Sequence, residues 1–312
     1  MAGDGAQRIG VSDGPVRAIL GPTASGKSAL ALAVAETLAA SGAAIEIVAV
    51  DAFTVYRGMD VGTAKPDAQT RARFPHHLLD VIDPAEELTV VRFRELARRA
   101  IADVHGRGAT ALLVGGSGLY WRAVVDDLAF PPTDPAVRRA VEERHGGDAA
   151  SLHTELVARD PAAAEHIGVH NARRLVRALE VIDLTGRRFS TWDDAWRSYA
   201  SIYRDLDVAF LDPATPDLRA AIDRRAQEMV RNGLLDEVAT LQAAPRSRTA
   251  AAAIGYAEAE AVLEGRMPLE DLPRAISDRT WRYARRQRSW FRADPRCEAV
   301  PPADVLSRWA AA

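Results

Sequence analysis

The segment at 21–28 constrains this chain of 312 residues more than any other feature. It reads Gly-Pro-Thr-Ala-Ser-Gly-Lys-Ser and fits the phosphate-loop pattern G-x-x-x-x-G-K-S/T. An apolar run at 16–20 predicts a buried strand before it, and helical spacing over 27–40 predicts a helix after it. In that setting the loop's backbone N–H groups and the helix dipole face an anion. We therefore predict a loop that binds a phosphate chain, formed by Gly21, Pro22, Thr23, Ala24, Ser25, Gly26, Lys27 and Ser28.

Two side chains of this loop carry its chemistry. Lys27 brings a positive charge to the terminal phosphate, and the Ser28 hydroxyl is a ligand for a Mg²⁺ that bridges phosphate oxygens. Lys27 and Lys65 are the only lysines in a chain whose other basic residues are arginines, which suggests that a compact ammonium is needed at these positions. The loop accepts a phosphate chain in general, so ATP and another diphosphate ester both remain open.

Strands and helices alternate through the first part of the chain. Further strands are predicted at 45–50, 110–114 and 206–211, with a helix at 89–105. Strands separated by helices in this rhythm predict a parallel sheet with helices on both faces. The expected fold class is therefore α/β, with a phosphate-loop NTPase-like core.

The middle of the chain changes character after Pro131 and Pro132. From 135 to about 190 the pattern is only helical, and the last third is mostly helical as well, at 216–243, 250–264 and 269–292. A helical block between two α/β stretches indicates an inserted domain. We expect a disordered leader at 1–14, a core formed by 15–121 and 201–312, and a helical insertion domain at 122–200.

Composition excludes several classes of protein. The net charge of −3 excludes a globally basic nucleic-acid binder, although it leaves room for local basic patches. No apolar run approaches the ~18 residues of a membrane span, and 1–16 lack the apolar centre of a secretory signal. The seven histidines are scattered and predict no metal site. With Cys297 as the lone cysteine, we expect a cytoplasmic protein with no membrane association and no obligate protein partner.

Polar residues follow two of the predicted strands. Asp51 ends the strand at 45–50, and Ser117 follows Gly115 and Gly116 after the strand at 110–114. Because ligands bind off the carboxyl ends of parallel strands, both side chains are expected to face the same crevice as Lys27. A loop carboxylate or a magnesium ligand remains an alternative for Asp51, and a helix N-cap remains one for Ser117.

Longer strings carry a resemblance that covers about 16–295. They are the phosphate loop, DAFTVYRGMDVGTAKP at 51–66, PHHLLDVIDP at 75–84, GGSGLY at 115–120, RRLVRALEV at 173–181, IGY at 254–256 and RYARRQRSWFR at 282–292. With these strings the chain resembles the tRNA dimethylallyltransferases, also called tRNA isopentenyltransferases. The string at 51–66 is long and highly specific, whereas the glycine-tyrosine pair is weak by itself.

The resemblance implies a defined reaction. A dimethylallyl group passes from dimethylallyl diphosphate to the exocyclic amine of the adenosine immediately 3′ of the anticodon in tRNA. The implied catalytic residues are Asp51 as the base that takes the amine proton, Lys27 on the departing diphosphate together with Mg²⁺, and Ser117 as a hydroxyl near the amine. The positions that match tRNA contacts to the anticodon stem-loop are Asp51, Ala52, Phe53, Thr54, Ser117, Arg138, Arg173, Arg174, Arg177, Gly255, Tyr256, Arg282 and Arg286.

The sequence departs from the family pattern at three places. Ala52 and Thr54 stand where the family commonly has Ser and Gln, which removes two polar side chains from the acceptor side. Ala221 replaces an arginine that often precedes the isoleucine of the helix near 218–230, although Arg225 is present one turn later. If the missing arginine binds phosphate in the family, a neighbouring residue must replace it here.

Two arginine clusters suit a polyanion. One lies at 173–177, and the other comprises Arg279, Arg282, Arg285, Arg286, Arg288 and Arg292, interleaved with Trp281, Tyr283, Trp290 and Phe291. Arginines at helical spacing beside aromatic rings suit RNA phosphates and unstacked bases. The plainer interpretation is a solvated helix whose aromatic residues pack on the core.

Three other functions fit part of the sequence. A phosphate-loop kinase of a nucleoside or small metabolite shares the loop, the strand-end Asp51 and an arginine-rich lid, but it needs no long helical insertion. A non-catalytic nucleotide switch shares only the loop. A prenyltransferase acting on free adenine nucleotides shares the chemistry, but it does not need two arginine clusters.

Overall fold

The computed structural model describes residues 13–192, 196 and 198–310. The expected leader at 1–14 therefore lies outside the described residues, except for Asp13 and Gly14. The chain divides into two compact units, the first formed by residues up to Asp126 together with those from Ser201 onward, and the second by Asp127–Ala200. The first boundary falls later than the expected 121/122, because helix α4 (Gly118–Val125) continues to Val125 and buries its apolar side chains in the first unit.

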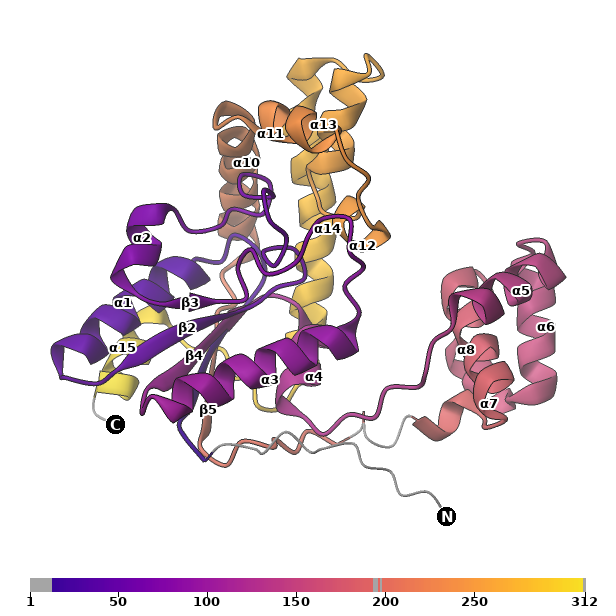
Figure 1. Cartoon of the computed structure of the whole chain (residues 1–312), viewed down its shortest axis with the longest axis horizontal. Coiled ribbons are helices and arrows are strands. Elements are labelled where there is room, and N and C mark those ends of the chain that lie inside the picture. Colours follow the sequence, from indigo (N-terminus) through magenta and orange to yellow (C-terminus); the bar gives the residue numbers. More distant parts are fainter. Residues whose placement is uncertain (1–12, 193–195, 197, 311–312) are drawn as a thin grey trace. The chain divides into compact units, whose positions relative to one another are not determined.

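The first unit is built on a parallel sheet (Figure 1). Its strands are β1 (Val16–Leu20), β2 (Ile45–Val50), β3 (His76–His77), β4 (Thr110–Gly115) and β5 (Leu206–Phe210), in the order β3-β2-β4-β1-β5. The register places Leu20 beside both Gly115 and Phe210, and Val50 beside Gly115. The carboxyl ends of four neighbouring strands therefore meet, which brings the phosphate loop, Asp51 and Gly116 to one edge. The expected α/β fold with a parallel sheet is confirmed.

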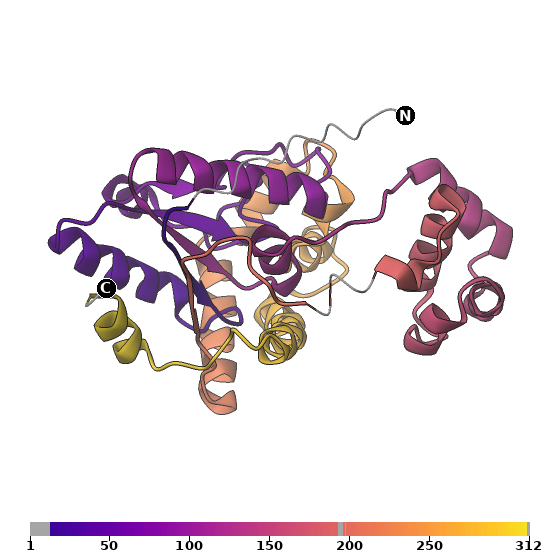
Figure 2. The same ribbon diagram turned by 90° about the horizontal axis from the view of Figure 1, so that it is seen from below.

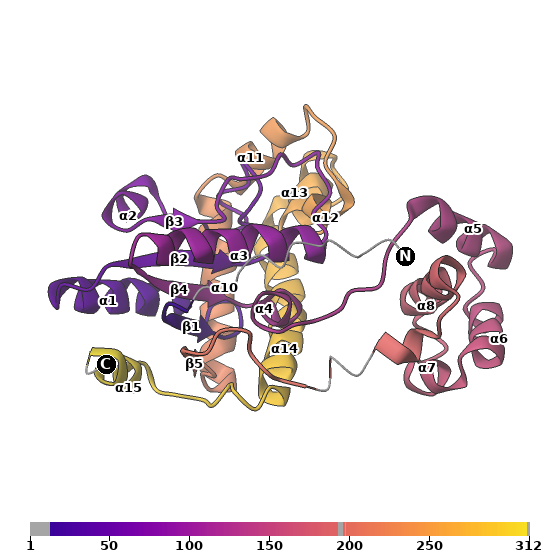
Figure 3. The ribbon, with the colours of Figure 1, turned by 60° about the horizontal axis from the view of Figure 1, so that its bottom comes forward.

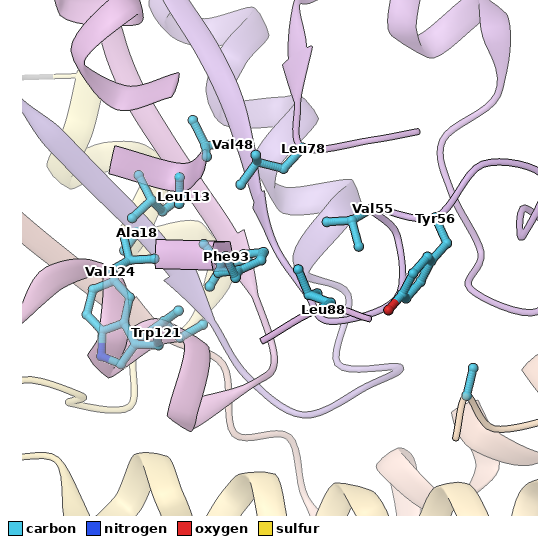
Figure 4. Packing of buried hydrophobic residues seen from close by; sticks show 14 of the residues in the cluster. Ala18, Val48, Val55, Tyr56, Leu78, Leu88, Phe93, Leu113, Trp121 and Val124 are labelled. Carbon is cyan, nitrogen blue, oxygen red and sulfur yellow. The ribbon is translucent and has the colours of Figure 1, made fainter. Parts of the chain in front are cut away.

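Helices cover both faces of this sheet, because its strands are apolar on both sides. On one face, Phe93 and Trp121 pack against Ala18, Val48 and Leu113, as Figure 4 shows. The other face bears alternate strand residues such as Ile19 and Leu112. Figure 3 shows α3 on one side of the sheet and α15 on the other. The helices at the faces are α1 (Lys27–Ala40), α3 (Val90–Gly106), α4 and α15 (Pro302–Ala310), while the short α2 (Ala68–Arg73) has no buried residue.

A second group of helices stands at the carboxyl edge of the sheet. It comprises α10 (Thr215–Arg231), α11 (Leu234–Leu241), α12 (Arg248–Ala251), α13 (Tyr256–Leu263) and α14 (Leu272–Ala293), the last preceded by the 3₁₀ turn Leu269–Asp271. The long helices α10 and α14 pack along each other (Figure 1). This pair supplies the wall that faces the phosphate loop.

The predicted elements are corrected at four places. The helix expected at 216–243 is divided at Gly233 into α10 and α11, and that expected at 250–264 is divided at Gly255, since both glycines have positive φ values (93° and 100°) that a right-handed helix does not continue through. His76 and His77, where no strand is predicted, form an edge strand that pairs with β2. The segment after 292, where no helix is predicted, contains α15, whose Trp309 is buried against the sheet.

The second unit is a small helical bundle with its own core (Figure 2). It contains α5 (Pro135–His145), α6 (Ala149–Arg159), α7 (Pro161–His166), α8 (Ala172–Thr185) and a 3₁₀ turn at Phe189–Trp192. Asp134, Asp148 and Asp160 cap α5, α6 and α7, because each carboxylate accepts hydrogen bonds from first-turn N–H groups. Within the described residues, no helix of the chain is long and apolar enough to cross a membrane.

Candidate functional site

A cavity of about 420 Å³ opens at the carboxyl edge of the sheet, within the first unit. Its walls come from the phosphate loop, the end of β2, the loop after it, α10 and α14. Of the residues predicted for the site, Thr23, Lys27, Ser28, Asp51, Phe53 and Thr54 line it. The structure therefore brings together the diphosphate-binding and the acceptor-side predictions.

The phosphate loop has a conformation that suits an anion. Gly26, with a φ of 87°, precedes the first turn of α1, and that turn carries no acidic residue. The Ser25 hydroxyl is buried and has no hydrogen-bond partner among the described residues. The Lys27 ammonium donates to the Pro22 carbonyl at 2.6 Å, so the lysine is folded back over its own loop.

The charge of Lys27 depends on what occupies the cavity. Its side chain is only partly exposed to the cavity. Burial, followed by repulsion from Arg225, lowers the pKa of Lys27 to about 7, while Asp51 acts in the opposite direction. An anion bound beside Lys27 would restore its proton.

Asp51 is held by its own turn. Its Oδ1 accepts a hydrogen bond from the Phe53 N–H at 2.8 Å, and the carboxylate lies near enough to Lys27 and Arg225 to raise the pKa of each against the effect of burial. The Thr54 hydroxyl lines the same cavity, is buried and has no partner in the described chain. Ala52 is 7% exposed and is not among the described residues that line the cavity.

Ser117 occupies the N-cap of α4 but does not cap it through its side chain. Its neighbours Gly115 and Gly116 line the cavity, whereas Ser117 is not among the lining residues of the described chain. Ser117 therefore stands at the N-cap position without a side-chain cap, directly after two residues that line the cavity.

Arg225 is a site residue that the motifs did not predict. It lies on α10, lines the cavity, and its Nη2 donates to the Thr63 carbonyl at 3.5 Å. Its Nε is buried without a partner among the described residues, and burial lowers the pKa of Arg225. The available signal was its position: Ile222 and Ala226 flank it on the apolar face of α10, where an arginine has no packing reason to be.

Gly255 and Tyr256 are two of the positions that the resemblance predicts to contact tRNA. Both are buried, and the Tyr256 hydroxyl donates to Glu237 at 2.6 Å. Glu237 also accepts hydrogen bonds from the N–H groups of Asp60, Val61 and Gly62 at 2.7–3.1 Å. Tyr256 and Glu237 therefore hold the loop at 60–62. Residues 62–64 of this loop form a wall of the cavity.

Lys65, the second lysine, has a structural role. Its side chain is 1% exposed, and its ammonium donates to the Tyr56 carbonyl at 2.5 Å, to Asp60 at 2.7 Å and to Asp80 at 2.5 Å. Three acceptors around one point fit an ammonium and not a guanidinium. This geometry explains why lysine stands at this position.

The arginine cluster on α14 divides into two groups. Three members are held by carboxylates: Arg279 by Glu258, and Arg288 and Arg292 by Asp212. The exposed group is Arg282, Arg285 and Arg286, and Trp290 is 44% exposed one turn later. The two arginines predicted to bind tRNA on this helix therefore lie on its exposed side.

The arginine cluster of the second unit divides in the same way. Arg138 and Arg177 both bond to Glu180, a fully buried carboxylate, and Arg177 also donates to the carbonyls of Pro131 and Pro132. These two guanidiniums stabilise the entry into the bundle, so their expected role as free RNA ligands is not supported by the structure. Arg173 and Arg174 are exposed.

The oxygen donors at the cavity fit a hard cation. The Ser28 hydroxyl and the Asp51 carboxylate both line it, and Mg²⁺ prefers such ligands together with substrate phosphates. No group of three or more His, Cys, Asp or Glu residues in the described chain could hold a metal by itself. A cation here would therefore depend on a bound phosphate chain for most of its ligands.

Comparisons with known proteins agree on one family. The family described as IPP transferase matches residues 54–294. The tRNA dimethylallyltransferase of Bifidobacterium animalis is 47% identical over 283 residues, which are 90% of this chain and 80% of the relative. The solved tRNA isopentenylpyrophosphate transferase of Bacillus halodurans is 34% identical with a TM-score of 0.67, covering 95% of this chain and 94% of that one. A eukaryotic dimethylallyltransferase solved acting on tRNA is 26% identical with a TM-score of 0.74, covering 89% and 70%.

Proposed function

Because this chain belongs to the tRNA dimethylallyltransferase (IPP transferase) family, it is a prenyltransferase that acts on tRNA, and we propose how its residues carry out that reaction. The donor is dimethylallyl diphosphate, and the acceptor is the exocyclic amine of the adenosine 3′ of the anticodon. The enzyme is cytoplasmic and needs no obligate protein partner, in keeping with a cavity whose walls all come from one unit of one chain.

The diphosphate binds at the phosphate loop. Lys27 and Arg225 supply two positive charges inside a partly desolvated cavity, where the attraction of each to a phosphate is stronger than in water. Ser28 and the diphosphate would hold Mg²⁺, which would neutralise part of the leaving group's charge. Arg225 thus takes the place left open by Ala221.

Asp51 accepts the proton from the amine. The nitrogen bonds to the allylic carbon as the carbon–oxygen bond breaks, and the diphosphate leaves with the electron pair. The aryl amine is a weak nucleophile, so a carboxylate that takes its proton contributes typically 10²–10⁴-fold. The turn at Phe53 keeps this carboxylate at the cavity wall.

The observation that carries the proposal is the mixed lining of one cavity. Beside Lys27, Asp51 and Arg225 stand the apolar side chains Ile222, Ala226, Met229, Ile254 and Ile276. An apolar wall of this kind suits a five-carbon prenyl group, whereas transfer of a phosphoryl group does not require one.

Incubation with labelled dimethylallyl diphosphate, Mg²⁺ and tRNA should transfer label to RNA without consuming ATP. Release of ADP in step with product would favour the kinase alternative.

The exposed arginines give a salt-dependent contact with RNA. Replacing Arg173 and Arg174 together by alanine should weaken binding of an anticodon stem-loop and flatten the slope of log affinity against log salt. Each phosphate contact contributes roughly 0.7–0.9 to that slope, so the loss should reach up to about 1.8. Arg177 is left intact because its loss would remove one of the two guanidiniums that bond to the buried Glu180, together with the bonds to the Pro131 and Pro132 carbonyls.

A matched control removes two exposed arginines elsewhere. Arg107 and Arg308 pair with acidic residues at the amino ends of the strands, opposite the cavity. Their double alanine variant should keep the wild-type slope in the same filter-binding titration. An equal loss of slope in both variants would remove Arg173 and Arg174 as specific contacts.

Donor binding should take up a proton above neutral pH. In the empty enzyme Lys27 has a pKa of about 7 and is mostly neutral at pH 8, and the diphosphate should return it to the charged form. Affinity for dimethylallyl diphosphate should therefore fall as the pH rises above about 7 and stay level below it. Titration calorimetry at pH 8 in buffers of different ionisation enthalpy measures the uptake. Lys27→Arg should abolish it, because arginine stays charged, and uptake equal to the wild type would contradict this account.

A further inference from the structure

Gln287 lies between the phosphate loop and the loop that follows β4. It belongs to α14 and is 4% exposed, although its neighbours Arg285 and Arg286 are exposed. Its Nε2 donates to the Gly116 carbonyl at 2.6 Å, and its Oε1 accepts the Thr23 N–H at 2.9 Å. One carboxamide therefore joins the phosphate loop after β1 to the loop after β4.

The surroundings are shaped for this contact. A Cβ on Gly116 would lie 2.4 Å from Gln287 Nε2, so only glycine allows the amide to approach the carbonyl this closely. Because the Thr23 N–H donates to Gln287, this hydrogen bond joins two residues that both line the cavity. The Gly116 carbonyl needs a donor and the Thr23 N–H needs an acceptor, and the carboxamide of a glutamine supplies both.

We propose that Gln287 is a positioning residue that sets the distance between the bound diphosphate and the acceptor amine, an inference that rests on the proposed function. The donor is held by the loop at 21–28, and the loop at 115–117 borders the acceptor side. A displacement of about 1 Å between reacting groups can cost up to about 10²-fold in rate. Loosening the link should therefore slow the chemical step and leave the affinity for the donor nearly unchanged.

Two variants separate this role from general support of the fold. Gln287→Met keeps the length and removes both hydrogen bonds, so the single-turnover rate should fall roughly 10- to 100-fold while the donor dissociation constant changes less than about threefold. Gln287→Glu places a carboxylate against the Gly116 carbonyl at neutral pH. When protonated, however, that side chain again has one donor and one acceptor.

The rate of Gln287→Glu relative to wild type should therefore rise as the pH falls, because burial raises the pKa of such a carboxyl. The relative rate of Gln287→Met should stay level over the same range. Gln227→Met is the control, since Gln227 is exposed on α10 and should change neither quantity. Thermal unfolding of each variant shows whether it folds, and the pH-dependent recovery still tests the proposal if Gln287→Met does not fold.

Three results would overturn the proposal: a wild-type single-turnover rate in Gln287→Met, a loss confined to donor affinity, or a level relative rate for Gln287→Glu. The proposed function fails differently, because then the wild type itself transfers no label to tRNA. The two failures are thus distinguishable in the same experiment.

Discussion

Asp51→Asn should lower the single-turnover rate of prenyl transfer by about 10²–10⁴-fold while tRNA affinity stays within a few-fold of wild type. Asparagine keeps the oxygen that accepts the Phe53 N–H, so the turn should persist. It lacks the basicity to take the amine proton and the charge that counters Lys27 and Arg225. Rapid-quench kinetics with saturating donor measure the chemical step directly.

One side effect of this variant must be controlled. Asp51 opposes the lowering of the Lys27 pKa, so its loss should lower that pKa further and weaken donor binding above neutral pH. Measurements at about pH 6, with the donor saturating, separate the loss of the base from the loss of donor. A near-normal single-turnover rate under those conditions would remove Asp51 from the mechanism.

Lys27→Ala should have the second large effect, on both donor affinity and rate. The ammonium attracts the bound diphosphate and stabilises the negative charge that develops on the diphosphate as it leaves. Loss of one such interaction typically costs about 10²–10³-fold in rate. Equilibrium binding of dimethylallyl diphosphate and single-turnover kinetics measure the two effects, and Lys27→Arg should restore part of each.

The other lysine offers a contrast to this result. Lys65→Met should lower the melting temperature, because it leaves Asp60 and Asp80 facing each other without their shared ammonium. Lys27→Ala should not lower it, since an uncharged side chain relieves the repulsion with Arg225. If Lys27→Ala loses activity only by unfolding, the phosphate-loop assignment has no support from this variant.

The sequence predicted the parts of the site that lie in short, continuous segments. The phosphate loop and Asp51 each follow a strand, and parallel strands bring their carboxyl ends together. The strand β3 could not be predicted in this way, because its two residues are too few to show an apolar pattern.

Sequence reasoning missed residues that the tertiary fold brings in from distant helices. Arg225 and Gln287 are far from the phosphate loop along the chain, and although the sequence analysis names Arg225 and quotes the string that contains Gln287, their local sequence does not show that they face this loop. The resemblance also predicts tRNA contacts at Tyr256 and Arg177, whose polar groups bond within the protein in this structure. Tyr256 bonds to Glu237 within the protein. Arg177 pairs with Glu180 one turn later, a spacing that the sequence itself displays.

The central claim is that the acceptor is an adenosine of tRNA and not a free nucleotide. Labelled dimethylallyl diphosphate should be offered to an anticodon stem-loop and to adenosine monophosphate at equal concentration, and the products digested and identified by mass spectrometry. The account predicts label on the exocyclic amine of the adenosine 3′ of the anticodon, one diphosphate released per transfer, and almost none on the mononucleotide. Equal prenylation of both acceptors would contradict it.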